Sequence, residues 1–155
     1  MSQGFKLMFD IKDLYQEIIV DHNRNPRNFG TIDNADKVME GFNPLCGDKL
    51  KLYLKTEGQN ITDISFDGSG CAISVASASL MTDAMKGKSI NDAELLFNSF
   101  HELITTEYGA DEKSLGKLAV LAGVKDFPAR VKCATLCWHT LHSALIGDNK
   151  SVTTE

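Results

Sequence analysis

Three cysteines and one aspartate stand beside turn residues or expected helix starts in this sequence. Cys46 and Asp48 lie in the turn NPLCGD, Cys71 follows the turn GSG, and Cys133 ends the stretch FPARVKC. Three thiols and a carboxylate form a complete tetrahedral ligand set for zinc. The same residues form a deliberately incomplete set for an iron–sulfur cluster, which usually takes four cysteines. The residue types leave both kinds of metal chemistry open.

The turn that carries Cys46 is polar and contains Pro44 and Gly47. Cysteine is usually buried as a small apolar side chain, so a cysteine in such a turn is better explained as a ligand or a nucleophile. Asp48 offers a harder oxygen ligand beside the sulfur. Considered alone, Asp48 is equally well explained as an ordinary aspartate at the start of a strand.

Cys71 stands where a strand is expected to end and a helix to begin. The free N–H groups and partial positive charge of a helix N-terminus stabilise a thiolate, and the glycines before Cys71 leave room for a large ligand. Cys133 is expected to begin the last helix, after Pro128, with Arg130 and Lys132 close to it in sequence. Either cation could lower the pKa of the thiol or bind an anionic sulfur group, although surface charge is the commoner role for Lys132.

The remaining cysteine, Cys137, lies one helical turn after Cys133, in an apolar stripe with Trp138. We therefore expect a buried structural thiol rather than a fourth sulfur ligand. The histidines show no third ligand at a recognisable spacing, so we expect them to pack or to lie on the surface: His22, His101, His139 and His142.

The composition narrows the class of protein. A chain of 155 residues suits one domain, here residues 1–155, and its 16 basic and 21 acidic side chains give a net charge of -5. That balance argues against binding to nucleic acids or anionic membranes. No apolar run is long enough to span a bilayer, and the N-terminal segment lacks the apolar stretch of a signal peptide. We therefore expect a cytoplasmic protein, in which thiols stay reduced.

The elements that must position these side chains follow from the spacing of apolar residues. Residues 11–22 predict a first helix, which Asp10 could cap and which ends at residues 25–30. Residues 49–55 alternate strictly, with three leucines on one face and mostly lysines on the other, and residues 62–67 predict the returning strand after a turn at residues 56–60. Residues 38–42 predict a third strand. The last two strands along the chain are expected to form an antiparallel hairpin.

The second half of the chain is helical in pattern. One helix is expected from Cys71 to a stop at Gly87, and a second after a cap at Ser89. A shorter helix covers residues 115–123, the last one extends to residue 145, and residues 148–155 are expected to be frayed. Strands followed by helices predict an α+β fold. It has the N-terminal helix first and a small antiparallel three-stranded sheet with helices packed on one face.

Taken together, these motifs resemble those of the SufU/IscU-like family of iron–sulfur cluster assembly proteins, which includes NifU N-terminal-like domains. The match covers nearly the whole chain and keeps the family's order. It comprises LY at residues 14–15, DH at 21–22 with NPRNFG at 25–30, NPLCGD at 43–48, GSGCAIS at 68–74 with MTD at 81–83, and FPARVKC at 127–133 with Trp138.

Within this family the chain resembles the SufU branch. The long segment between Cys71 and Cys133 is similar to the SufU insertion, and Arg130 matches an arginine that SufU proteins keep near the site. Scaffolds of the IscU type usually carry a Leu-Pro-Pro-Val-Lys chaperone motif and a histidine just before the last cysteine. Here that stretch reads FPARVK, with Lys132 in place of the histidine. Cys137 departs from the family's usual alanine.

The resemblance implies that Cys46, Asp48, Cys71 and Cys133 bind zinc. It also implies a pyridoxal-phosphate-dependent cysteine desulfurase of the SufS kind as a partner, with Cys46 as the thiol that accepts persulfide sulfur. Arg130 is then expected to restrain Asp48 or to neutralise the sulfur anion.

If the protein is an enzyme, it is expected to be a zinc-dependent sulfurtransferase that acts before downstream iron–sulfur assembly proteins. The alternative is a scaffold on which iron, as a [2Fe–2S] cluster, is assembled and passed on. A blander alternative is a structural zinc domain that only docks to partners.

Overall fold

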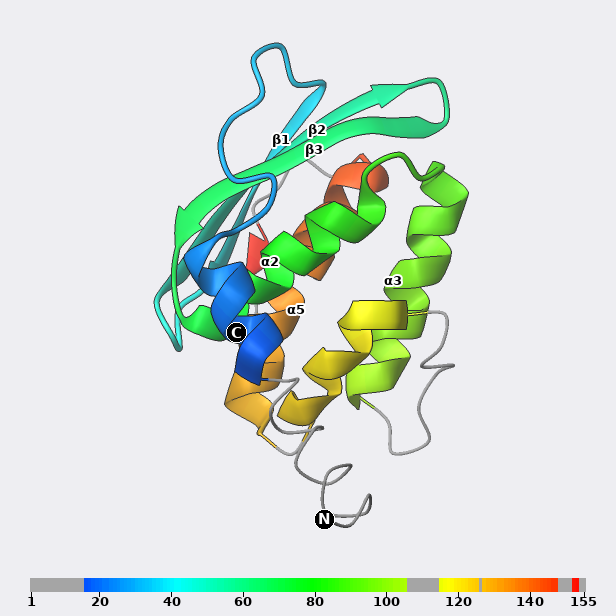
Figure 1. Ribbon diagram of the computed structural model, residues 1–155. Helices are drawn as coiled ribbons and strands as arrows, with labels where there is room; N and C mark the ends of the chain where they lie inside the picture. The colour runs from blue at the N-terminus through cyan, green and yellow to red at the C-terminus, as the bar shows by residue number, and fades with distance from the viewer. Residues whose placement is uncertain (1–15, 106–114, 126, 148–151, 154–155) are drawn as a thin grey trace.

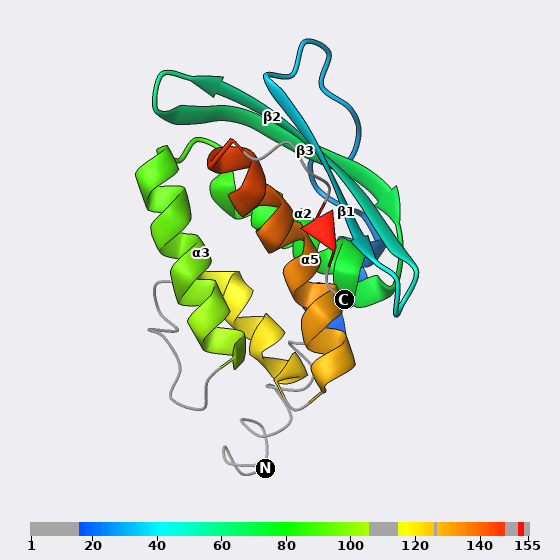
Figure 2. The same cartoon turned by 180° about the vertical axis from the view of Figure 1, so that it is seen from behind.

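One sheet lies against a layer of helices in the computed structural model, which describes residues 16–105, 115–125, 127–147 and 152–153 (Figure 1). The opposite view shows the same arrangement, with the helices gathered on one face of the sheet (Figure 2). This is the α+β fold that the sequence predicts. None of the described helices combines the length and the apolar character needed to cross a membrane.

The sheet is built on an antiparallel meander. Strands β1 (Lys37–Asn43), β2 (Asp48–Glu57) and β3 (Asn60–Ser69) pair in sequence order, and the full strand order is β3-β2-β1-β4. The predicted hairpin and the third strand are confirmed, although β2 and β3 are longer than predicted and a register shift lies between Lys55 and Thr56. The alternation in β2 places the leucines at positions 50, 52 and 54 in the core.

The fourth strand corrects the predicted three-stranded sheet. Strand β4 (Val152–Thr153) pairs with β1 in parallel, so the sheet has four strands and is not purely antiparallel. The sequence predicts frayed ends over residues 148–155, of which the structure describes residues 152–153. A strand of two residues is too short to show alternation, and only its neighbour in the folded chain defines it.

The helices largely follow the predicted apolar stripes. Residues 16–24 are helical and bury Ile19 and His22, whereas the predicted positions 10–15 lie outside the described residues. Helix α2 (Ala72–Met85) is followed by Gly87, with φ of 86°. Helix α3 (Ile90–Thr105) is capped by Ser89, whose hydroxyl accepts from the amide N–H of Asp92 at 3.1 Å.

The predicted short helix near residue 120 is η1 (Gly116–Val124), which is 3₁₀ rather than α-helical. Helix α5 (Pro128–Leu145) corrects a second expectation, because it begins five residues before Cys133 (133 minus 128). Proline is favoured in the first turn of a helix, where its missing N–H costs nothing. Cys133 therefore lies on the second turn of α5, not at its start.

The core lies between the sheet and the helices. Leu52, Leu54 and Phe66 from the sheet are buried together with residues of α2, α3 and α5. Trp138 of α5 stacks on Phe100 of α3, with 4.0 Å between ring centroids. Helix α5 packs so close to β1 that a Cβ atom at Gly41 would collide with the side chain of Thr140. This packing carries the first turns of α5 to the end of the β1–β2 hairpin.

Candidate metal centre

The loop between β1 and β2 presents Cys46 at the surface. Asn43 and Asp48 form the last register pair of the two strands, and residues 44–47 connect them. Gly47 has φ of 73°, a left-handed conformation that favours glycine and closes the loop. Cys46 is exposed, as its polar turn predicts.

Asp48 is a buried carboxylate, only 1% exposed, and both of its oxygens have donors. Oδ1 accepts from the backbone N–H of Cys71 at 2.8 Å, and Oδ2 accepts from Nδ2 of Asn43 at 3.1 Å. The carboxylate lies directly against Gly70, where a Cβ atom would overlap with Oδ1. A buried carboxylate needs such partners. The two donors therefore favour a specific role for Asp48 over that of an ordinary turn aspartate.

Cys71 is the N-cap residue of α2. Its backbone is extended, with φ of -70° and ψ of 164°, and its Sγ accepts from the N–H of Ser74 at 3.4 Å. The same sulfur lies 3.9 Å from Oδ2 of Asp48. The expected placement at the strand-to-helix junction is therefore found.

Cys133 approaches the same point from α5. Its side chain is buried, its Sγ lies 3.1 Å from Sγ of Cys46, and it accepts from Nδ2 of Asn43 at 3.4 Å. Burial raises the pKa of the Cys133 thiol above its usual range, and its contacts with the thiols of Cys46 and Cys71 raise the pKa further. A cation at this point would oppose both effects, because metal ions deprotonate the thiols that coordinate them.

Three of the expected donor atoms lie close enough together to hold one metal ion. Ligand atoms of Cys46, Asp48 and Cys133 all lie within 4.8 Å of one another, the one such cluster found among the described residues. Cys71 adjoins it through its contact with Asp48. Donors around zinc at ordinary bond lengths are about 3.8 Å apart. The structure thus brings three of the four expected ligands together, and it places the fourth, Cys71, in contact with one of them.

Cys137 points elsewhere. Its side chain is buried, and its Sγ lies 3.5 Å from Oγ of Ser77 in α2. Burial raises the pKa of this thiol to about 12. It is not in the cluster of metal-ligand groups found in the described part of the chain. These observations agree with the buried structural thiol that the sequence predicts.

Arg130 is exposed, and its guanidinium lies over the ring of Phe127, 4.9 Å from the centroid. Among the described residues, Asp48 takes its hydrogen bonds from Asn43 and Cys71 rather than from Arg130. A role for Arg130 beside a sulfur anion stays a prediction. Asn43 was not among the expected site residues, although a polar residue that ends a strand just before a cysteine turn is a usable signal.

The histidines pack as expected. His22 is buried, with Nδ1 at 2.7 Å from Oγ of Ser79. His101, His139 and His142 surround the ring of Phe97, and His142 stacks on it at 4.6 Å. Burial lowers the pKa of His22, with a further lowering from Arg27. Burial also lowers the pKa of His139, as do the neighbouring imidazoles.

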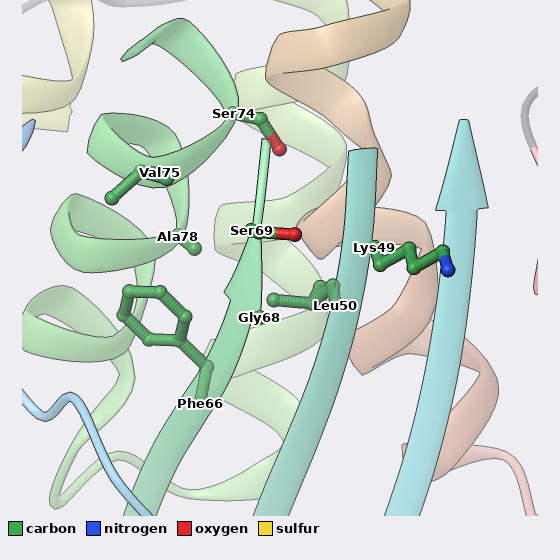
Figure 3. A pocket seen from close by; sticks show the side chains of 8 residues that line it. All are labelled: Lys49, Leu50, Phe66, Gly68, Ser69, Ser74, Val75 and Ala78. Carbon is green, nitrogen blue, oxygen red and sulfur yellow. The ribbon is translucent and has the colours of Figure 1, made fainter. Parts of the chain in front are cut away.

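A small cavity of about 10 Å³ lies behind the first turns of α2, against the adjoining ends of β2 and β3 (Figure 3). Its lining includes Ser69 and Ser74, which Figure 3 shows at one end of it. This space is at the lower limit for one water molecule. The cavity is therefore too small for a substrate, whereas Cys46 on its exposed loop is open to solvent.

Comparison with known proteins gives a consistent picture. The family model described as the NifU-like N terminal domain matches residues 14–134. A zinc-dependent sulfurtransferase SufU from Bacillus subtilis is 42% identical over 136 residues, which is 88% of this chain and 92% of that protein. An iron-sulfur cluster assembly scaffold protein IscU from Streptococcus pyogenes is 41% identical over 135 residues, covering 87% and 84% of the two chains.

Solved structures share the fold. A crystal structure from Fervidobacterium islandicum, described as an iron-sulfur cluster assembly scaffold protein for the SUF system, superposes with a TM-score of 0.80. Its sequence is 39% identical, and the match covers 85% of this chain and 96% of that one. Both kinds of relative, sulfurtransferase and scaffold, are therefore similar to this chain over most of their length.

Proposed function

The chain belongs to the family of NifU-like N-terminal domains, and from this premise we propose that it is a zinc-dependent sulfurtransferase for iron–sulfur cluster assembly. One observation carries the proposal. An exposed thiol, Cys46, stands 3.1 Å from a buried thiol, Cys133, beside a buried carboxylate. Such a site has an exposed ligand, Cys46, that a partner can reach, and two buried ligands, Asp48 and Cys133, that it cannot.

The proposed ligands are Cys46, Asp48, Cys71 and Cys133. Zinc, when bound, would keep these thiols deprotonated at neutral pH and mask the nucleophile until a partner group takes its coordination position. The protein's own part is to hold the ligands at unequal accessibility. Asp48 and Cys133 are buried and hydrogen-bonded, while the loop at residues 44–47 leaves Cys46 at the surface.

The proposed transfer is a thiol–persulfide exchange. The Cys46 thiolate attacks the outer sulfur of a persulfide on the partner's cysteine and forms a new S–S bond. The partner's S–S bond breaks, and its electron pair leaves with the partner's cysteine as a thiolate. Cys46 then carries the persulfide, and no external oxidant or reductant is consumed. Arg130, one turn before Cys133 on α5, is proposed to neutralise the anionic sulfur.

The proposed partner is a pyridoxal-phosphate-dependent cysteine desulfurase in a reducing compartment such as the cytoplasm. Two apolar side chains in the segments that carry the site support such docking. Leu45 is 66% exposed next to Cys46, and Phe127 is 50% exposed at the start of α5. Exposed apolar side chains that form one patch are typical of a protein-binding surface, and we propose that these two side chains belong to such a patch. Downstream iron–sulfur assembly proteins are the proposed recipients of the sulfur.

Desulfurase turnover tests this function. Purified protein of known zinc content should stimulate a SufS-type desulfurase, and mass spectrometry should find one added sulfur on Cys46. The variant Cys46→Ala should give no stimulation above background. Full stimulation by Cys46→Ala would contradict the proposal, and the variant Cys137→Ala serves as the matched control.

The scaffold function remains the second candidate, favoured by the oxygen ligand. Three thiolates and a carboxylate would hold a [2Fe–2S] cluster less firmly than four thiolates, which suits a cluster that is passed on. Anaerobic reconstitution that yields a cluster transferable to an apo-ferredoxin would support this candidate. A protein that keeps zinc and takes up no iron would exclude it.

A further inference from the structure

Asn43, the last residue of β1, is buried at the centre of the proposed metal site. Its side chain is fully buried, and its amide nitrogen donates to two of the four proposed ligands. Nδ2 lies 3.1 Å from Oδ2 of Asp48 and 3.4 Å from Sγ of Cys133. A primary amide has two N–H groups, so each ligand receives one hydrogen.

The orientation of this amide follows from its neighbours. The reverse orientation would set the amide oxygen against the Asp48 carboxylate, where two acceptors would repel each other. In the orientation found, Oδ1 of Asn43 is buried with no hydrogen-bond partner among the described residues. A buried unpaired acceptor disfavours folding. Because its unpaired oxygen lowers the stability of the fold, Asn43 is better explained by a role at the proposed metal site than by a contribution to stability.

We propose that Asn43 is a positioning residue for the metal site, and that it holds Asp48 and Cys133 in place for the ion. This inference rests on the proposed function, since it concerns the same zinc ligands. Groups that hydrogen-bond to ligands fix their orientation, and their loss typically weakens metal affinity about 10- to 100-fold. Asn43 also closes the loop that carries Cys46, because it pairs with Asp48 across the hairpin. It thereby restrains two of the four proposed ligands and leaves Cys46 free to exchange.

The variant Asn43→Leu separates the two explanations. Leucine has nearly the same size, cannot donate to Asp48 or Cys133, and removes the unpaired acceptor. We expect zinc affinity, measured by competition with a chromophoric chelator, to fall about 10- to 100-fold. The melting temperature of the metal-free variant is measured beside it, because the loss of a donor to the buried Asp48 carboxylate lowers stability while the loss of the unpaired acceptor raises it. A merely structural asparagine would lower the melting temperature and leave zinc affinity unchanged.

Ser77→Ala is the matched control. Ser77 is also a fully buried polar residue, and it accepts from Nε1 of Trp138 at 3.1 Å while donating to the carbonyl of Ala134 at 2.6 Å. It touches none of the proposed ligands in these contacts. Its loss should lower the melting temperature and leave zinc affinity within about threefold of wild type. If Asn43→Leu does not fold, Asn43→Ala replaces it in the same zinc titration.

Equal zinc affinity in the Asn43 variant and the wild type would overturn the inference, even if the wild type stimulates the desulfurase. Weakened zinc binding in the variant, with no stimulation by the wild type, would instead overturn the proposed function and leave the role of Asn43 in place. A wild-type protein that binds no zinc would overturn both.

Discussion

Cys133 and Cys137 lie one turn apart on α5, yet they belong to two different regions of the molecule. Both are buried, each at 2% exposure. Cys133 contacts the thiol of Cys46 and the side-chain amide of Asn43, and that amide also donates to the carboxylate of Asp48. Cys137 meets the hydroxyl of Ser77 inside the apolar core. Burial alone therefore does not separate a proposed ligand from a packing residue, whereas the polar groups opposite each thiol do.

The most direct way to break this comparison is to remove each thiol in turn. Cys133→Ala should weaken zinc binding by about 100- to 1000-fold, since four ligands share the binding free energy of such a site. Cys137→Ala should bind zinc within about threefold of wild type and lose only folding stability, through a small cavity in the core. Chelator competition measures the first effect and chemical denaturation the second. Equal loss of zinc in both variants would show that the two regions are one site.

Thiol alkylation compares the two regions by the reactivity of their cysteines. The thiolate is the reactive form, and a pKa of about 12 leaves Cys137 almost entirely protonated at pH 8. Cys46 is exposed. In the native metal-free protein, Cys46 should react with iodoacetamide at least about 100-fold faster than Cys137. Peptide mapping over time measures both rates, and comparable rates would contradict the burial of Cys137.

Two glycines test the same division at the level of the backbone. Gly70→Ala places a Cβ atom against Oδ1 of Asp48, so zinc affinity should fall about 10-fold, and displacing the buried carboxylate should also cost about 1–3 kcal/mol of stability. Gly41→Ala places a Cβ atom against Thr140 of α5 and should cost about 1–3 kcal/mol of stability. Its zinc affinity should stay near that of wild type. If Gly41→Ala lowered zinc affinity and Gly70→Ala did not, the separation of the proposed metal site from the core would be contradicted.

The smallest expected effect is a pH dependence of the core region. Burial lowers the pKa of His22 and His139 in the folded state, so the unfolded chain binds more protons below about pH 6.5. The stability of the metal-free protein should be full above that pH and should decline as the pH falls toward the lowered values. Urea unfolding at pH 7.5 and 5.5 measures the decline. His139→Gln should reduce it, and an unchanged decline would contradict the lowered pKa of His139.

Much of the fold could be predicted because its signals are local. The alternation at residues 49–55 specifies β2, and Ser89 and Gly87 mark helix boundaries. Strand β4 could not be predicted, because two residues carry no period of their own. The start of α5 was placed too late, since the apolar stripe begins after the proline that opens the helix.

The site divides in the same way. Cys46 and Cys71 stand beside local turn and cap signals, so their exposure and placement could be predicted. The convergence of Cys133 with Cys46 depends on how α5 packs against β1, across 87 residues of sequence. Rules based on short spacings in the sequence cannot predict a contact between residues so far apart in the chain. The two donors to Asp48, one from Asn43 and one from the start of α2, likewise exist only in the folded chain.

The separation between Cys46 and Cys133 also has a consequence for synthesis. A ribosome makes the chain from its N-terminus, so the β1–β2–β3 meander can form while α5 has not yet been made. During that interval Cys46 and Cys71 are present without their buried counterpart, and β1 still lacks β4 along its open edge. The nascent chain thus has an incomplete set of the proposed ligands and an unpaired strand edge. Completion of the proposed metal site and closure of the sheet must both wait until helix α5 and strand β4 have been made.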